Sequence, residues 1–135
     1  MKPIYHTPDQ QELFDTVAEA LLKQGCSSIN AAGTCVYRSP DGHKCAAGFL
    51  IPDELYDSRM EFQSFGSLLN DPLFVGVLSF LEPHKGLITD LQIVHDEWSG
   101  QDNPELWRTG IVKGLKVVSA RWNLSPSVLN KEITQ

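Results

Sequence analysis

The sequence predicts a mostly helical α+β domain, with about five helices and one two-stranded antiparallel hairpin. The chain of 135 residues is close to the commonest domain size, so we expect residues 1–135 to form a single domain around one core. Apolar residues recur at helical spacing through most of the chain. One stretch, at about residues 34–46, instead combines a turn motif with flanking segments that can pair.

The first predicted helix has recognisable signals at both ends. Thr7 is the expected N-cap, Pro8 suits the first helical position, and Gln10 completes a capping box. Gly25 then predicts the end of the helix. Between these ends, one apolar face collects Leu13, Phe14, Val17, Leu21 and Leu22.

The predicted hairpin is centred on residues 39–42. Pro40 at the second and Gly42 at the fourth position are typical of a type I turn. If the loop holds three residues, Tyr37 faces Cys45 across the hairpin. One face of the hairpin then carries Cys35, Tyr37, His43 and Cys45, and the other carries Val36, Arg38 and Lys44.

The second half of the chain is predicted to be helical. A proline-led turn is expected at 52–56, a buried helix at 73–81, and an amphipathic helix at 87–98 that ends before Gly100. The longest helix is expected at about 104–122, after an asparagine and proline pair that is typical of a helix start.

The longest predicted helix has two distinctive features. Residues 1–103 carry 6 basic and 15 acidic residues, whereas residues 104–135 carry 5 and 2. We expect this basic segment to be a solvated face that complements the acidic remainder, with a phosphate-binding patch as the alternative. Gly110 and Gly114 lie one turn apart and allow another backbone to approach closely. A helix of this chain is the expected neighbour, and a second subunit is the alternative.

Composition limits the class of protein. The formal net charge of -6 has the wrong sign for nucleic-acid binding, so we expect no nucleic-acid partner. No apolar run is long enough for a membrane span or a signal peptide, which favours a cytoplasmic protein without a membrane partner. Three cysteines are an odd number, so free thiols in a reducing compartment are expected.

Four side chains could in principle bind a zinc ion: Cys26, Cys35, His43 and Cys45. Zinc modules usually supply their ligands in close pairs, and only the last two of these residues are near each other in the sequence. We therefore expect no metal and no cofactor, and interpret the thiols as small core side chains.

A cysteine nucleophile is the main enzymatic alternative. Cys45 precedes a potential helical turn, which would lower its pKa, and His95 could be its base. We expect Asp96 to orient the His95 ring poorly, because the side chains of neighbouring residues on a helix point about 100° apart. His95 and Asp96 also form the dipeptide of metal-dependent phosphohydrolases, but the companion histidines do not fit: His84 is only eleven positions upstream and His43 lies in the predicted hairpin. We therefore interpret His95 as a histidine that flanks the core with its hydrogen bonds satisfied. Whether the chain is an enzyme stays open, with the balance against it.

Three stretches resemble small uncharacterised proteins of bacteria and their phages. The resemblance covers about residues 10–123 and implies a compact, mostly helical fold, but it brings no known activity. The stretches are Cys35-x-Tyr37, Asp41-Gly42-x-x-Cys45-Ala46-x-Gly48-x-Leu50-Ile51-Pro52-Asp53-Glu54 and Leu91-Gln92-x-x-His95-Asp96.

The functional expectation is a small cytoplasmic binding or regulatory protein, related to phage proteins, whose partner is another protein. The residues expected to bind this partner are Tyr37, Arg38, Asp53 and Glu54. The alternative is a small cysteine-dependent hydrolase that uses Cys45 and His95. The sequence leaves the oligomeric state open.

Overall fold

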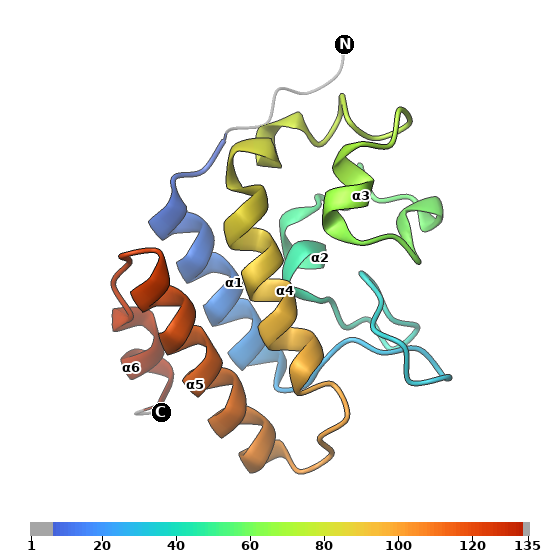
Figure 1. Ribbon diagram of the computed structural model, residues 1–135. Coiled ribbons are helices and arrows are strands. Elements are labelled where there is room, and N and C mark those ends of the chain that lie inside the picture. Colours follow the sequence, from blue (N-terminus) through green and yellow to red (C-terminus); the bar gives the residue numbers. More distant parts are fainter. Residues whose placement is uncertain (1–6, 134–135) are drawn as a thin grey trace.

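The computed structural model describes the backbone of residues 7–133 and the side chains of residues 7–130 (Figure 1). This part of the chain contains six α-helices, two 3-10 helices and no β-strand, so the predicted α+β class is wrong and the fold is helical. The elements are α1 (Gln10–Gln24), α2 (Ala46–Leu50), η1 (Ser58–Met60), α3 (Phe65–Leu69), η2 (Ser79–His84), α4 (Lys85–Glu97), α5 (Pro104–Arg121) and α6 (Ser127–Ile133).

The predicted hairpin at about 34–46 is not a hairpin of strands, although its turn is present. The Gly42 N–H donates to the Ser39 carbonyl at 3.0 Å, as a type I turn requires. Beyond the turn, Arg38 and Lys44 form one isolated antiparallel bridge in the expected register. Within residues 7–133 this bridge does not extend into a strand.

The pairing stops because the two groups that would form the next hydrogen bond, the Tyr37 N–H and the Cys45 carbonyl, have other partners. The Tyr37 N–H donates to the Glu61 carboxylate at 2.9 Å. The Cys45 carbonyl accepts the Phe49 N–H at 3.1 Å, which is the first hydrogen bond of α2. The Cys45 N–H still donates to the Tyr37 carbonyl at 3.4 Å, so a local helix and a distant carboxylate replace only the return bond of this pair. Sequence pattern could predict the turn but not this competition.

Helix α1 confirms most of its prediction, but its N-cap is two residues later than expected. Asp9, not Thr7, caps the helix by accepting the Glu12 N–H at 2.7 Å. Gly25 ends the helix with φ +81°, the left-handed conformation that glycine adopts without strain. The predicted apolar face is fully buried: Leu13, Phe14, Val17, Leu21 and Leu22.

The predicted buried helix at 73–81 is wrong. Residues 72–78 form successive turns, and only the end of the segment belongs to η2. Leu73 and Val75 are 58% and 45% exposed, so the apolar run does not lie wholly in the core. Its composition suited a buried helix, but only some of its apolar side chains find a place against the rest of the protein.

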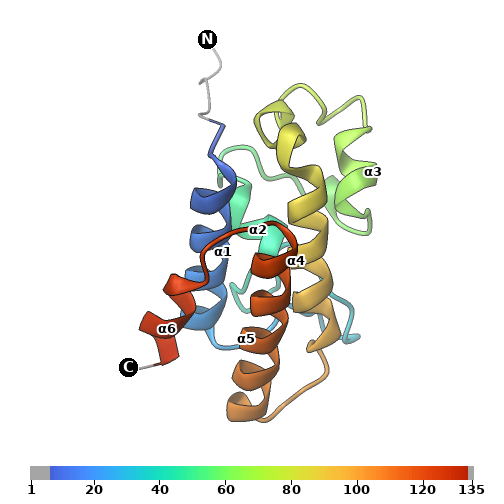
Figure 2. The same cartoon turned by 60° about the vertical axis from the view of Figure 1, so that its left-hand side comes forward.

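Helices α4 and α5 confirm the predictions at 87–98 and 104–122. They lie side by side and run in opposite directions, as Figures 1 and 2 show from two views. A methyl group at Gly110 would overlap the Trp98 ring, and one at Gly114 would lie 2.9 Å from Val94. The two glycines therefore let α4 pack closely on α5, and the expected neighbour, a helix of this chain, is confirmed.

The core is shared by α1, α2, α4 and α5, with α3 and α6 at its edges. Figure 2 shows α6 beside α1 and α3 on the far side of α4. None of the helices between residues 7 and 133 combines the length and the apolar character needed to cross a bilayer.

Candidate functional site

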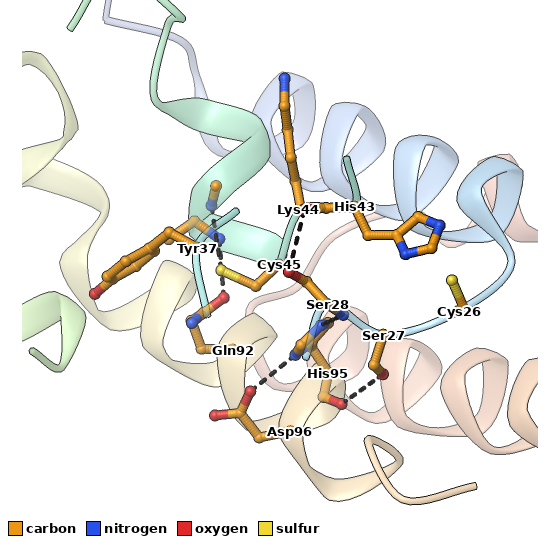
Figure 3. A network of polar contacts seen from close by, with 12 residues as sticks. Cys26, Ser27, Ser28, Tyr37, His43, Lys44, Cys45, Gln92, His95 and Asp96 are labelled. Carbon is orange, nitrogen blue, oxygen red and sulfur yellow. Dashed lines mark hydrogen bonds and ion pairs between the residues drawn. The ribbon is translucent and has the colours of Figure 1, made fainter. Parts of the chain in front are cut away.

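His95 is the centre of a buried polar cluster (Figure 3). Its side chain is fully buried on α4, and its Nε2 accepts the Ser28 N–H at 2.8 Å. A backbone N–H can only donate, so Nε2 carries a lone pair, and in the neutral ring the proton is on Nδ1. Nδ1 lies 2.8 Å from Asp96 Oδ1 and donates to it. The hydrogen bonds therefore fix one tautomer of His95.

The expectation that Asp96 would orient His95 poorly is wrong, because the two side chains are hydrogen-bonded. The 100° between neighbouring positions describes where the Cα–Cβ bonds point. Nδ1 and the carboxylate oxygens each lie two bonds beyond Cβ, which is far enough for the two side chains to bend together. The Asp96 side chain is 48% exposed, so this contact is at the edge of the buried cluster.

The cluster also connects α4 to α5. The Ser27 hydroxyl donates to the His95 carbonyl at 3.2 Å and accepts the Trp107 indole N–H at 2.9 Å. We call Ser27, Ser28, His95, Asp96 and Trp107 the His95 node. Nothing in the sequence singled out the two serines, because serine in a polar link is common and their partners within the node are more than 60 positions away.

Cys45 lies at the start of α2, as the hydrolase hypothesis requires, but its environment is unsuitable for a nucleophile. Burial raises the pKa of its thiol to about 12, although the Gly48 N–H and the Gln92 side chain act in the opposite direction. The thiol is therefore protonated at neutral pH. Among the described residues no hydrogen bond joins Cys45 to His95, both of whose ring nitrogens have other partners.

Cys35, not Cys45, is the thiol near His95. One ligand atom each from Cys35, His95 and Asp96 lie within 4.8 Å of one another. These three residue types suit zinc, but the ring offers no free lone pair: Nδ1 holds the proton and Nε2 faces the Ser28 N–H. Burial, together with the Asp96 charge, also raises the pKa of Cys35. This geometry favours a structural role over a metal site.

The four residues expected to bind a partner lie in and around one cluster whose charges are largely matched internally. Arg38 forms an ion pair with Asp53 at 2.9 Å and stacks over the Tyr56 ring at 4.5 Å from its centroid. Tyr37 is only 4% exposed, whereas Glu54 is exposed. Arg38 thus holds its own loop in place more than it presents a charge to solvent.

A groove with a volume of about 360 Å³ lies between α4 and α5. Val94 of α4 and Trp98, which directly follows α4, also line the groove where they approach Gly114 and Gly110 of α5. Ile93 and Val117 line it and are each 57% exposed. Single exposed apolar side chains are common on any surface, but apolar side chains that share one concave site with polar residues at its rim are typical of interaction sites.

Charged residues of opposite sign line the two sides of this groove. Asp90 and Glu97 come from α4, whereas Lys113 and Arg121 come from α5. The sequence predicted a basic C-terminal segment that complements the acidic remainder of the chain. The signal in the sequence that could have indicated the groove is Val117, an apolar residue that lies outside the main apolar face of this helix. We call this feature the α4–α5 groove.

No protein-family model matches the chain, and neither a curated protein nor a solved structure is significantly similar to it. The resemblance to small bacterial and phage proteins stays a prediction. The functional assignment must therefore come from the geometry of the sites themselves.

Proposed function

We propose that the chain is a small protein-binding module with a regulatory role, cytoplasmic and phage-related, whose binding site is the α4–α5 groove. One observation carries the proposal: a cavity of about 360 Å³ is lined by two half-exposed apolar side chains, Ile93 and Val117. Apolar centres with charged rims are common in sites that bind protein segments.

The Arg38–Asp53 cluster and the surroundings of Cys45 are less suitable functional sites than the groove. Arg38, Tyr37 and Asp53 are engaged within the chain, so a partner would first have to displace those contacts. The hydrolase alternative needs Cys45 as a thiolate beside a free imidazole nitrogen, and the raised pKa and the engaged ring both oppose it. The groove needs no rearrangement to accept a partner's side chain.

Selection of ligands from a random peptide library tests the proposal. The selected peptides should carry an apolar anchor between charged residues and should bind the wild-type protein in the micromolar range. Val117→Asp should weaken this binding by about tenfold or more, because it places a carboxylate in the apolar centre of the site. Fluorescence anisotropy of a labelled peptide measures both affinities.

Val75→Asp is the matched control, because Val75 is also a half-exposed valine but is not part of the groove. It should leave peptide affinity unchanged. Equal loss in both variants would contradict the proposal. So would amide chemical-shift changes, on adding the peptide, that are confined to the Arg38 and Asp53 cluster.

A further inference from the structure

Glu97 and Lys113 face the same groove from different helices and remain available to a partner. Glu97 is exposed on α4 and Lys113 is exposed on α5. Within the part of the chain that the structure describes, neither makes an ion pair. The α4 side of the groove thus presents an acid, and the α5 side presents a base.

The packing of α4 against α5 places Glu97 level with Lys113, and Ile93 level with Val117. Gly110 lies beside Trp98, and Gly114 lies beside Val94. Because the two helices are antiparallel, a residue further along α5 lies level with a residue nearer the start of α4. Glu97 and Lys113 therefore lie at similar heights along the groove. One helical turn further, Ile93 and Val117 lie at similar heights.

We propose that the α4–α5 groove binds a second copy of this chain, through a symmetric dimer in which the two grooves face each other. This inference rests on the proposed function, because it names the protein that the groove binds. A two-fold axis parallel to the helices keeps every residue at its height and places α4 of one copy against α5 of the other. The four helices then form an antiparallel bundle.

This arrangement pairs unlike charges and like apolar groups across the interface. Glu97 faces the partner's Lys113, and Ile93 faces the partner's Val117. Symmetry makes each contact twice, so the apolar centre contains two isoleucines and two valines. Charge complementarity in the same register as the apolar centre favours a second copy over an unrelated partner.

Asp90 and Arg121 complete the charge pattern at one end of the groove, but they already interact within the chain. Their side chains form an ion pair at 3.2 Å, and the Trp122 indole N–H donates to the same Asp90 carboxylate at 2.8 Å. Substitutions there would disturb the packing of one molecule. Glu97 and Lys113 are therefore the residues with which association can be tested without disturbing the fold.

Two charge-reversed variants, Glu97→Lys and Lys113→Glu, test the dimer by sedimentation velocity. Each variant alone would pair like charges twice across the interface, and its dimer should dissociate about tenfold or more readily than the wild type. An equimolar mixture contains a heterodimer in which both pairs are opposite in sign. The mixture should therefore regain association close to that of the wild type. Far-ultraviolet circular dichroism checks that each variant remains helical.

Rescue by mixing cannot come from contacts within one molecule. In each variant, residues 97 and 113 of the same chain carry like charges before and after mixing. A wild-type protein that stays monomeric at about 100 μM would overturn the inference. So would a wild-type dimer that neither charge reversal weakens, or single variants that dissociate but do not recover on mixing.

The outcomes also separate this inference from the proposed function. If the wild type is monomeric while selected peptides bind it and not Val117→Asp, the groove binds protein segments but not a second copy. If neither peptides nor a second copy bind, both proposals fail. Peptide affinity is measured at a protein concentration below that at which any dimer forms, so that self-association does not compete.

Discussion

The His95 node and the α4–α5 groove share helix α4 but differ in how their polar groups are satisfied. In the node, His95 is fully buried and both ring nitrogens have partners within the chain. In the groove, Glu97 and Lys113 make no ion pair among the described residues, and Ile93 is 57% exposed. Matched, buried groups stabilise a fold, whereas exposed apolar groups beside unmatched charges favour binding.

Helical geometry explains how one helix contributes to both regions. Residues 93 and 97 are each two positions from His95, which places them about 200° around the helix from it. His95 therefore faces the core, while Ile93 and Glu97 face the groove. Substitutions on the two faces of α4 should consequently have opposite profiles, with one set affecting folding and the other affecting association.

The largest effect is expected from His95→Ala. This substitution leaves a cavity and removes the partners of the Ser28 N–H and of Asp96, so the free energy of unfolding should fall by about 3 to 5 kcal/mol. Urea denaturation measures the change. Asp96→Asn is the matched control: its amide oxygen can still accept the Nδ1 proton, and it should cost about 1 kcal/mol or less. A loss below about 1 kcal/mol for His95→Ala would contradict the structural role of the node.

A smaller effect, visible only at alkaline pH, is expected from Cys45. Its pKa is raised to about 12 in the folded protein, so the unfolded chain releases this proton first as pH rises. The contribution to stability is thus complete below about pH 8.5, the ordinary range of a thiol, and is lost progressively up to about pH 12. Cys45→Ala should flatten this alkaline decline in urea denaturation.

Alkylation of the folded protein provides the independent readout for the same thiol. Cys45 should react with iodoacetamide more slowly than Cys26 and Cys35, because it is buried and they are partly exposed. Rapid alkylation of Cys45 at neutral pH, abolished by His95→Ala, would instead revive the hydrolase hypothesis. A double variant, Cys26→Ser with Cys35→Ser, isolates the rate at Cys45.

The helices with strong local signals could be predicted from the sequence, because their evidence is contained within a few turns. Gly25 ends α1 as predicted, and Pro104 begins α5. The apolar face of α1 is buried as its 3.6-residue period required. The errors concern segments whose state is decided by distant partners, as when Glu61 accepts the Tyr37 N–H and only one hydrogen bond of the Tyr37–Cys45 pair remains.

The candidate sites were predicted in part. The sequence singled out His95 and Asp96, but the hydrogen bond between them was not expected. The serines that fix the tautomer are far away in sequence and carry no local signal. Cys45 was paired with His95, whereas the fold brings Cys35 to it. Which thiol meets which imidazole depends on how α2 and the 27–36 segment pack on α4, and no local pattern encodes that packing.

The smallest effect on folding is expected from Val117→Asp, and that small effect is what distinguishes the groove from the node. Val117 is 57% exposed, so the substitution removes little buried surface and should change the unfolding free energy of the monomer by less than about 1 kcal/mol.

At concentrations that favour a dimer, the wild type should gain apparent stability as concentration rises, because association stabilises the folded state. Val117→Asp should lose that concentration dependence. Thermal unfolding of both proteins over a range of concentrations measures it. Equal concentration dependence in both would place any self-association elsewhere on the molecule, whereas a large loss of stability at every concentration would mean that Val117 belongs to the core and not to a binding surface.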